Sequence, residues 1–191
     1  TQGVDDVWVS SDSEKILEVG CGYGAKPLLR PGNISGDQST SESGWLHALD
    51  QIENKTSSVD LVVAPQVTSP IRQSSDISNA LAEMRRRNLD SLLTVSKITD
   101  FFIWAHSGKG KPESVTYDYL NRKPRQLIEN RFLENGSFYI FSPKILRENK
   151  NRLGGEIGFK IMDKHKMFEI DDLDDLRLCE IIMRGYGLDK L

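Results

Sequence analysis

Residues 59–64 read VDLVVA and residues 91–95 read SLLTV, and a polar segment with helical periodicity separates these two apolar runs. Such continuous apolar runs are typical of parallel strands that are covered on both faces. The intervening residues 76–88 place their apolar side chains at helical spacing, which predicts a helix. Strand, helix and strand in succession predict a doubly wound α/β fold with a mostly parallel sheet. Ligands of such sheets bind at the carboxyl ends of the strands.

The same alternation continues toward both ends of the chain. Further strands are predicted at residues 4–10, 25–29, 136–141, 158–162 and 168–170. Further helices are predicted at residues 14–19, 44–52, 143–149 and 172–186, the first of them ended by Gly20, Gly22 and Gly24. Residues 97–134 break the alternation with a charged segment that contains aromatic, Gly and Pro residues. This segment is interpreted as an inserted lobe or a dimerisation arm in a single domain of residues 1–191.

Composition narrows the function classes. The 191 residues carry 25 basic and 28 acidic side chains, for a net charge of −3, which does not suggest a nucleic-acid binder. Cys21 and Cys179 are far apart, so neither a zinc site nor a disulfide framework is indicated. A membrane span and a signal pattern are not evident, which favours the cytoplasm, or the nucleus in an animal. The chain opens at Thr1 without an initiator Met, which suggests that an upstream segment is missing.

A loop with a stiff, polar sequence follows the strand at residues 59–64. It reads PQVTSPIR and presents Gln66, Thr68, Ser69 and Arg72 between and beside two prolines. Prolines restrict the backbone, so these polar groups would keep a fixed direction. The alternative is that Thr68 or Ser69 simply caps the following helix.

Two other loops carry arginine and polar side chains. The first runs from Arg30 to a hydroxyl-rich stretch with Ser39 and Ser41 at the start of a helix, where free N–H groups bind anions. The second contains Arg125 and Gln126, and Asn135 enters a strand shortly after it. An arginine fork suits a carboxylate or a phosphate. The alternatives are a capped surface loop for the first and a solvated arginine for the second.

The last polar segment is acidic and reads FEIDDLDDL, from Phe168 onward. All four polar loops are expected to lie at one edge of one sheet. Glu169 and Asp171 are two residues apart at a predicted strand end, so they would share a face and could hold Mg²⁺, with phosphates completing its shell. The aspartates that follow have another explanation, because negative charge is favoured in the first turn of a helix. The three histidines have no partner in a recognisable nucleophile arrangement, which argues against a triad or zinc hydrolase.

Taken in order, these segments resemble the CMP-sialic acid synthetase family, also called acylneuraminate cytidylyltransferases, including its legionaminic and pseudaminic acid relatives. The resemblance covers nearly the whole chain and rests on VDDVWVSSDSEKI, GAKPLLRP followed by DQSTS, PQVTSPIR, RQ with ENGSFYIF, and EIDDLDDL. Synthetases for the eight-carbon acid Kdo are less similar, because their equivalent of the TSP loop reads differently.

The resemblance implies a Rossmann-like nucleotidyltransferase fold and a homodimer in which the arm at about residues 97–134 reaches over the neighbour's active site. It implies transfer of CMP from CTP to the anomeric hydroxyl of a nine-carbon 2-keto sugar acid, a nonulosonic acid, with release of pyrophosphate. No nucleic acid or membrane would take part. Mg²⁺ would be the cofactor, held by Asp171, with Glu169 where relatives usually have a second Asp.

The resemblance also assigns the remaining site residues. Those expected at the nucleotide are Arg30, Ser39, Ser41 and Gln66. Those expected around the sugar acid are Gln66, Thr68, Ser69, Arg125, Gln126 and Asn135. Arg125 and Asp171 are the residues expected to carry catalysis.

Two departures from the family pattern leave alternatives open. Relatives begin with a strand and a triphosphate loop rich in Arg, Ser, Lys and Asn, and no such segment precedes Thr1 here. The chain is therefore expected to be truncated, or else to be a non-catalytic relic that binds a nucleotide or dimerises. Trp104 lies near a position where many bacterial relatives have a basic residue, so a nucleotidyltransferase for a different sugar is a further alternative.

Overall fold

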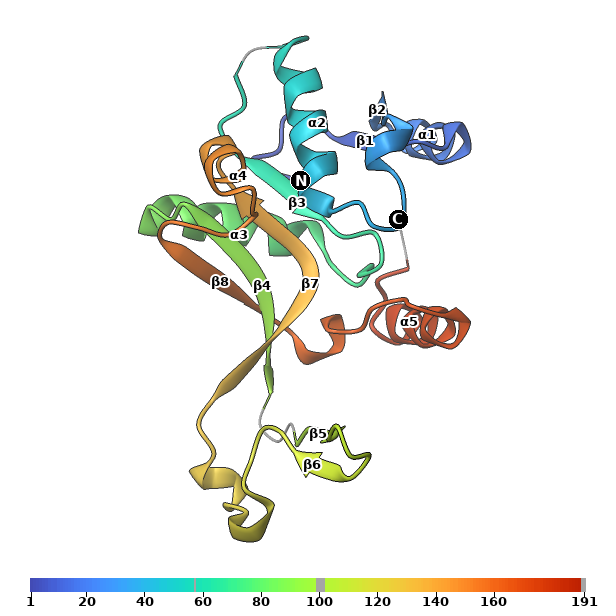
Figure 1. The fold of residues 1–191 in the computed structure, drawn as a ribbon. Helices are drawn as coiled ribbons and strands as arrows, with labels where there is room; N and C mark the ends of the chain where they lie inside the picture. Colours follow the sequence, from blue (N-terminus) through green and yellow to red (C-terminus); the bar gives the residue numbers. More distant parts are fainter. Residues whose placement is uncertain (57, 99–101, 190–191) are drawn as a thin grey trace.

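The computed structural model describes residues 1–56, 58–98 and 102–189. Its main sheet has the strand order β3-β7-β4-β8 (Figure 1). These strands are β3 (Val62–Pro65), β7 (Arg131–Phe141), β4 (Ser91–Ile98) and β8 (Ile157–Met162). β4 is parallel to β8, whereas β7 runs antiparallel to both β3 and β4. Three of the four strands therefore share one direction, and the predicted mostly parallel α/β sheet is confirmed.

Helices cover both faces of this sheet, as a doubly wound fold requires. α3 (Ser74–Arg87) packs on one face, and α2 (Ser41–Glu53) and α4 (Pro143–Asn149) lie on the other. β7 supplies both cores, because side chains alternate between the faces of a strand. Phe138 and Ile140 pack in the cluster with α3, whereas Tyr139 and Phe141 pack in the cluster with α2 and α4.

The N-terminal part forms a separate sheet of two parallel strands, β1 (Trp8–Ser11) and β2 (Lys26–Leu29). They are joined by α1 (Glu14–Gly22), so the prediction that Gly20 ends this helix was wrong. A Cβ on Gly20 would lie 2.6 Å from Cγ1 of Val9. The glycine is therefore used for close packing of α1 on β1, a need that local propensity does not reveal.

Near the C-terminus, a short 3₁₀ turn, η4 (Lys164–Lys166), connects β8 to the last helix, α5 (Leu173–Gly185). The strand predicted at residues 168–170 does not form. The η4 turn separates this segment from β8, and the backbone N–H of Ile170 instead donates to the carbonyl oxygen of Thr68, at 2.7 Å. The acidic segment is thus an extended loop that is tied to the loop after β3.

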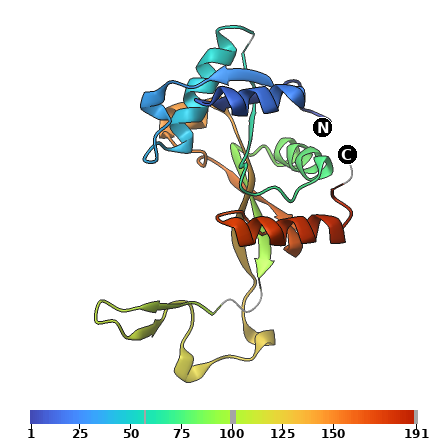
Figure 2. The same ribbon diagram turned by 90° about the vertical axis from the view of Figure 1, so that its right-hand side faces the viewer.

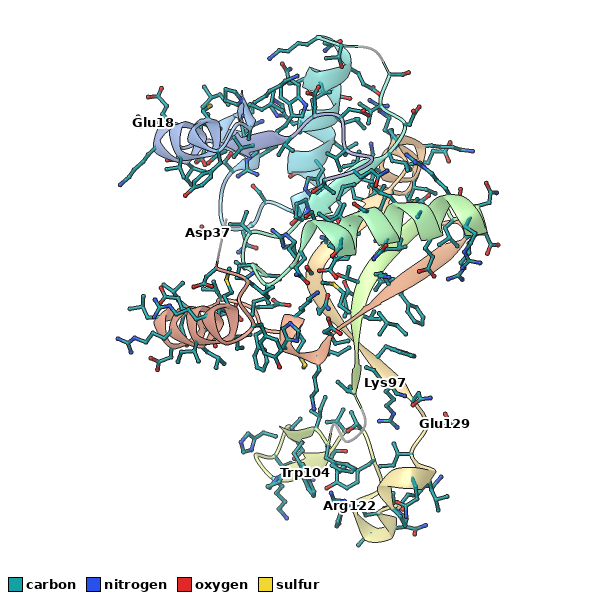
Figure 3. All side chains as sticks on the ribbon, turned by 180° about the vertical axis from the view of Figure 1, so that it is seen from behind. Glu18, Asp37, Lys97, Trp104, Arg122 and Glu129 are labelled. Atoms are coloured by element: carbon teal, nitrogen blue, oxygen red, sulfur yellow. The ribbon has the colours of Figure 1, made fainter. Side chains whose placement is uncertain are left out.

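An arm leaves the body between β4 and β7. It contains the hairpin of β5 (Trp104–His106) and β6 (Pro112–Ser114), followed by the 3₁₀ turns η2 (Tyr119–Asn121) and η3 (Arg125–Leu127). Figure 3 shows Trp104 and Arg122 at its far end, beyond Lys97 and Glu129 at its base. We use "the arm" for residues 102–130, because β4 and β7 extend through residues 97–98 and 131–134.

Among the described residues, no helix combines the length and the apolar character needed to cross a bilayer.

Candidate functional site

Three polar side chains from two separate loops converge on Gly136 in β7. A Cβ at this glycine would lie 2.3 Å from Oε1 of Gln66, 3.0 Å from Oε1 of Glu169 and 3.1 Å from Oγ of Ser69. Gly136 also has φ of +61°, a conformation that favours glycine. We call Gln66, Ser69, Gly136 and Glu169 the Gly136 cluster. The structure therefore brings together the loop after β3, the acidic loop that contains Glu169, and residues 134–136 of β7.

Two hydroxyl groups, one in this cluster and one directly after Gly136 in the sequence, are buried and have no hydrogen-bond partner within the described part of the chain. They are the Oγ atoms of Ser69 and Ser137, whose side chains are almost fully buried. An unsatisfied buried polar atom is costly and often marks a position for a water or a ligand. Neither Thr68 nor Ser69 caps α3, because Gln73 precedes that helix and donates its N–H to Asp76. The capping alternative for these two residues is therefore excluded.

Acidic side chains gather around Glu169 of the Gly136 cluster. Burial, and then the charges of Asp171 and Glu134, raise the pKa of Glu169 above its ordinary value. The Tyr139 hydroxyl donates a hydrogen bond of 2.5 Å to Oε1 of Glu134. Burial, and then this hydrogen bond, raise the pKa of Tyr139 to about 12, so its hydroxyl keeps its proton at neutral pH. Glu134 was missed from the sequence, although it directly precedes the Asn-Gly pair of the motif.

The acidic loop offers carboxylates of two kinds. Asp172 caps α5 and accepts hydrogen bonds from the N–H groups of Asp174 and Asp175, as the helix-start explanation predicted. Asp171 and Glu169 lie outside that helix and are exposed. Among the described residues, no three His, Cys, Asp or Glu side chains gather in a metal-binding group. A cation bound by Asp171 and Glu169 would therefore need oxygen ligands from water or phosphate.

Arg30 lies directly after β2, and its guanidinium approaches Gly44 near the start of α2. Its Nε donates to Oγ of Ser35 at 3.1 Å, and its Nη1 would lie 2.9 Å from a Cβ on Gly44. Ser39 and Ser41 are exposed, and Ser41 is the first residue of α2. Thr40 caps this helix by accepting from the N–H of Ser43. The predicted cap is thus present, and the hydroxyls beside it remain at the surface.

The loops that carry these residues lie on one side of the molecule. Figure 2 shows the segment after β2, the loop after β3 and the start of α5 on the face turned to the viewer. They are stacked along this face rather than gathered at one point. These three segments therefore lie on one face of the molecule, but they do not share an edge of one sheet, because β2 belongs to the separate two-stranded sheet and the acidic segment follows η4 instead of a strand.

Two predicted substrate residues have a different placement. Thr68 is exposed and holds Ile170 through its carbonyl oxygen. Asn135 is buried; its Nδ2 donates to Oγ of Ser96, and its Oδ1 accepts from the N–H of Ser137. The amide of Asn135 is thus used inside the fold. This placement supports a role in holding residues 136 and 137, not direct contact with a substrate.

Arg125 and Gln126 do not join the cluster within one chain. Both belong to η3 in the arm, which lies at the opposite end of the main sheet from α2 (Figure 1). Gln126 is exposed, and the side chain of Arg125 lies outside the described part of the structure. The expectation that all four polar loops meet at one edge is therefore wrong for a single chain, because the arm carries this loop away from the body.

Comparison with known proteins gives several relatives, although no family model matches the chain. It is 31% identical to N-acylneuraminate cytidylyltransferase A of Danio rerio and 29% identical to the N-acylneuraminate cytidylyltransferase of Oncorhynchus mykiss, covering 97% of this chain and 43% of each relative. The chain thus spans less than half the length of these curated relatives. It is 22% identical to the pseudaminic acid cytidylyltransferase of a Campylobacter jejuni strain, over 94% of this chain and 78% of that relative.

A solved structure shares the fold. It is a CMP:2-keto-3-deoxy-manno-octonic acid synthetase in complex with CTP, with a TM-score of 0.63 and 12% identity, and it covers all of this chain and 84% of that one. At this identity the likeness speaks for the nucleotidyltransferase fold alone. The sequence relatives, matched over most of the chain, support the placement of this protein in the CMP-sialic acid synthetase family.

Proposed function

We propose that the protein containing this chain transfers CMP from CTP to the anomeric hydroxyl of a nonulosonic acid and releases pyrophosphate. The observation that carries the proposal is the convergence of Gln66, Ser69 and Glu169 on Gly136. It brings together, at one point of a nucleotidyltransferase fold, an amide, a carboxylate and a buried hydroxyl that has no hydrogen-bond partner among the residues that the structure describes. The names of the sequence relatives supply the substrate class.

In the proposed reaction, the sugar hydroxyl releases its proton to solvent and its oxygen forms a bond to the α-phosphorus of CTP. The bond from that phosphorus to the oxygen bridging the α- and β-phosphates breaks, and pyrophosphate leaves with the electron pair. Such transfers require the protein mainly to position the reactants and to balance charge. We assign Arg30, Ser39 and Ser41 to the nucleotide, and Gln66 and Ser69 to the point where nucleotide and sugar meet.

The acidic loop suits a divalent cation by its chemistry. Glu169 and Asp171 provide hard oxygen donors, and their mutual repulsion contributes to the raised pKa of Glu169. A bound cation would relieve this repulsion. When bound, Mg²⁺ would neutralise negative charge on the phosphates. Asp171 and Glu169 are the residues proposed to hold it.

We also propose that the active form is a homodimer in which the arm of one copy approaches the body of the other. Arg125 and Gln126 would then face the acidic sugar in the neighbour's site. A row of apolar side chains on β8 supports this assembly, because Ile157, Phe159 and Ile161 are 41–51% exposed on one face of an edge strand. Large exposed apolar surfaces commonly mark interfaces.

The test is a pyrophosphate-release assay that compares CTP with other nucleoside triphosphates and a nonulosonic acid with other sugars. Turnover with CTP and the nine-carbon acid is expected. Asp171→Ala should lower cation-dependent turnover by on the order of 10²-fold or more with the fold intact. Asp174→Ala is the matched control, because the Asp174 carboxylate is exposed and, among the described residues, forms an ion pair only with Arg177.

Other outcomes of this assay have clear meanings. Binding of CTP in calorimetry without turnover, by a protein that includes the complete coding sequence, would contradict the proposal and favour a binding relic. Turnover with a different sugar would contradict the substrate assignment alone. Calorimetric titration with Mg²⁺ in the absence of substrates tests the cation site directly, since Glu169→Gln should weaken the binding.

A further inference from the structure

Arg72 is the one charged side chain of the loop after β3, and its guanidinium turns into the protein. Its Nη1 lies 3.1 Å from the carbonyl oxygen of Gln66, 2.6 Å from that of Ser69 and 2.9 Å from that of Ser137. Two of these carbonyls belong to its own loop, and the third belongs to β7. One nitrogen thus joins three backbone positions around the Gly136 cluster.

The charge of this guanidinium is balanced in an unusual way. No carboxylate forms a salt bridge with Arg72 within residues 1–56, 58–98 and 102–189. Burial lowers its pKa, but an arginine in a protein remains protonated at neutral pH. Carbonyl dipoles therefore stabilise the charge, and charged donors make stronger hydrogen bonds than neutral ones.

The three carbonyls fix the backbone that carries the cluster. The carbonyl oxygen of Gln66 accepts from Arg72 and from the N–H of Ser69 at 3.3 Å, and the N–H of Gln66 donates to Ser137 at 3.3 Å. The same loop holds the acidic segment through the bond from Ile170 to Thr68. The direction of the Gln66 and Ser69 side chains toward Gly136 thus depends on a loop that closes around Arg72.

We infer that Arg72 is a positioning residue for the proposed cytidylyl transfer, acting through Gln66 and Ser69. It needs no contact with substrate for this role. The inference rests on the proposed function for its kinetic consequence, but the closure of the loop around Arg72 is a property of the fold and is measurable without substrates.

The kinetic test compares Arg72→Met and Arg72→Lys with the unchanged enzyme. Arg72→Met should raise the KM for the sugar acid and lower kcat, with kcat/KM reduced by on the order of 10²-fold. Arg72→Lys should recover part of this loss, because an ammonium group still donates to carbonyl oxygens. Arg86→Met is the matched control, since Arg86 is exposed in the last turn of α3. Its kcat/KM should stay within about twofold of the unchanged enzyme.

A double-mutant cycle with Gln66→Ala decides whether Arg72 acts through Gln66. If it does, Arg72→Met should cost much less in the Gln66→Ala background than in the unchanged enzyme. Equal fold-losses in the two backgrounds would overturn this pathway. Thermal unfolding measures how much of each variant is folded. If the loss of activity matched the loss of folded protein, and if Arg72→Lys recovered nothing, Arg72 would have a purely structural role.

Hydrogen exchange provides the measurement that does not need activity. Arg72→Lys should speed amide exchange in residues 66–72 by at least about tenfold while β4 stays protected. Unchanged exchange in that loop would overturn the inference even if the enzyme were active. If Arg72→Lys sped exchange in this loop while the unchanged protein had no cytidylyltransferase activity, the loop closure would be upheld and the proposed function would be contradicted.

Discussion

β7 runs through two regions of opposite character. Residues 135–141 are all buried between the helices of the body, whereas three of the four residues at 131–134 are exposed where the strand leaves for the arm. The body has apolar cores on both faces of its sheet, while the arm rests on ring contacts at its surface, such as Trp104 with Tyr117 and Tyr119. Trp104 is 45% exposed.

The body and the arm therefore differ in how they are stabilised. The body buries enough apolar surface to be stabilised within one chain, since hydrophobic burial is the dominant favourable contribution. The arm buries little and is expected to gain its stability from another surface. The Gly136 cluster lies at the transition along β7, so its geometry is set by packing within the body, whereas the residues of η3 would depend on the proposed homodimer.

The largest effect should follow a truncation in the body. Phe138→Ala should lower the free energy of unfolding by about 3–5 kcal/mol, because the fully buried ring would leave a cavity between α3 and the sheet. Urea denaturation measures this loss. A loss below about 1 kcal/mol would show that the core of the body is loosely packed and would contradict the contrast with the arm.

The next effect concerns the glycine at the transition. Gly136→Ala should cost about 1–3 kcal/mol of stability and most of the activity, because φ of +61° is strained for alanine and the new methyl group would meet Gln66. Gly110→Ala in the arm is the control, because Gly110 has φ of +70° and, apart from its chain neighbours, no described residue would place a heavy atom within 4 Å of the new Cβ. If both variants lost the same stability and activity, crowding at the cluster would have no role.

A smaller effect on stability is expected in the arm. Trp104→Ala should change the free energy of unfolding of the body by less than about 0.5 kcal/mol. It should weaken self-association by about tenfold or more, because exposed aromatic residues are frequent anchors of interfaces. Sedimentation measurements over a range of concentrations follow the dimer. If Trp104→Ala left self-association unchanged even though the arm had unfolded, the role of the arm in the interface would be contradicted.

The smallest effect should come from Glu169 and depends on pH. Because the pKa of this carboxyl is raised in the folded protein, the folded state holds its proton more tightly than the unfolded state. Its favourable contribution is present below the unfolded pKa and is lost as the pH rises through the folded pKa. In the absence of divalent cations, the Glu169→Gln variant should therefore be more stable than the unchanged protein at neutral pH. This gain should be absent at a pH below the unfolded pKa. Denaturation curves across this range, and their reversal by Mg²⁺, test the sign.

Much of the fold followed from local patterns. The prediction of α4 at residues 143–149 matches the structure, and the apolar runs at residues 91–95 and 136–141 lie within β4 and β7. Periodicity identifies such elements because burial repeats with the geometry of the helix or strand. Gln66 and Glu169 were singled out for their chemistry, and the structure brings them together at Gly136.

Other features needed the folded chain. The direction of β7 and the loop at residues 168–170 depend on which backbone groups pair, which no local pattern encodes. The inward turn of Arg72 and the approach of Glu134 to Glu169 arise between segments far apart in sequence. The sequence alone determined the alternating elements and the chemical groups available, because both follow from residue type and spacing. Which of these groups meet depends on the folded chain, because those contacts are made by packing and hydrogen bonding across the sheet.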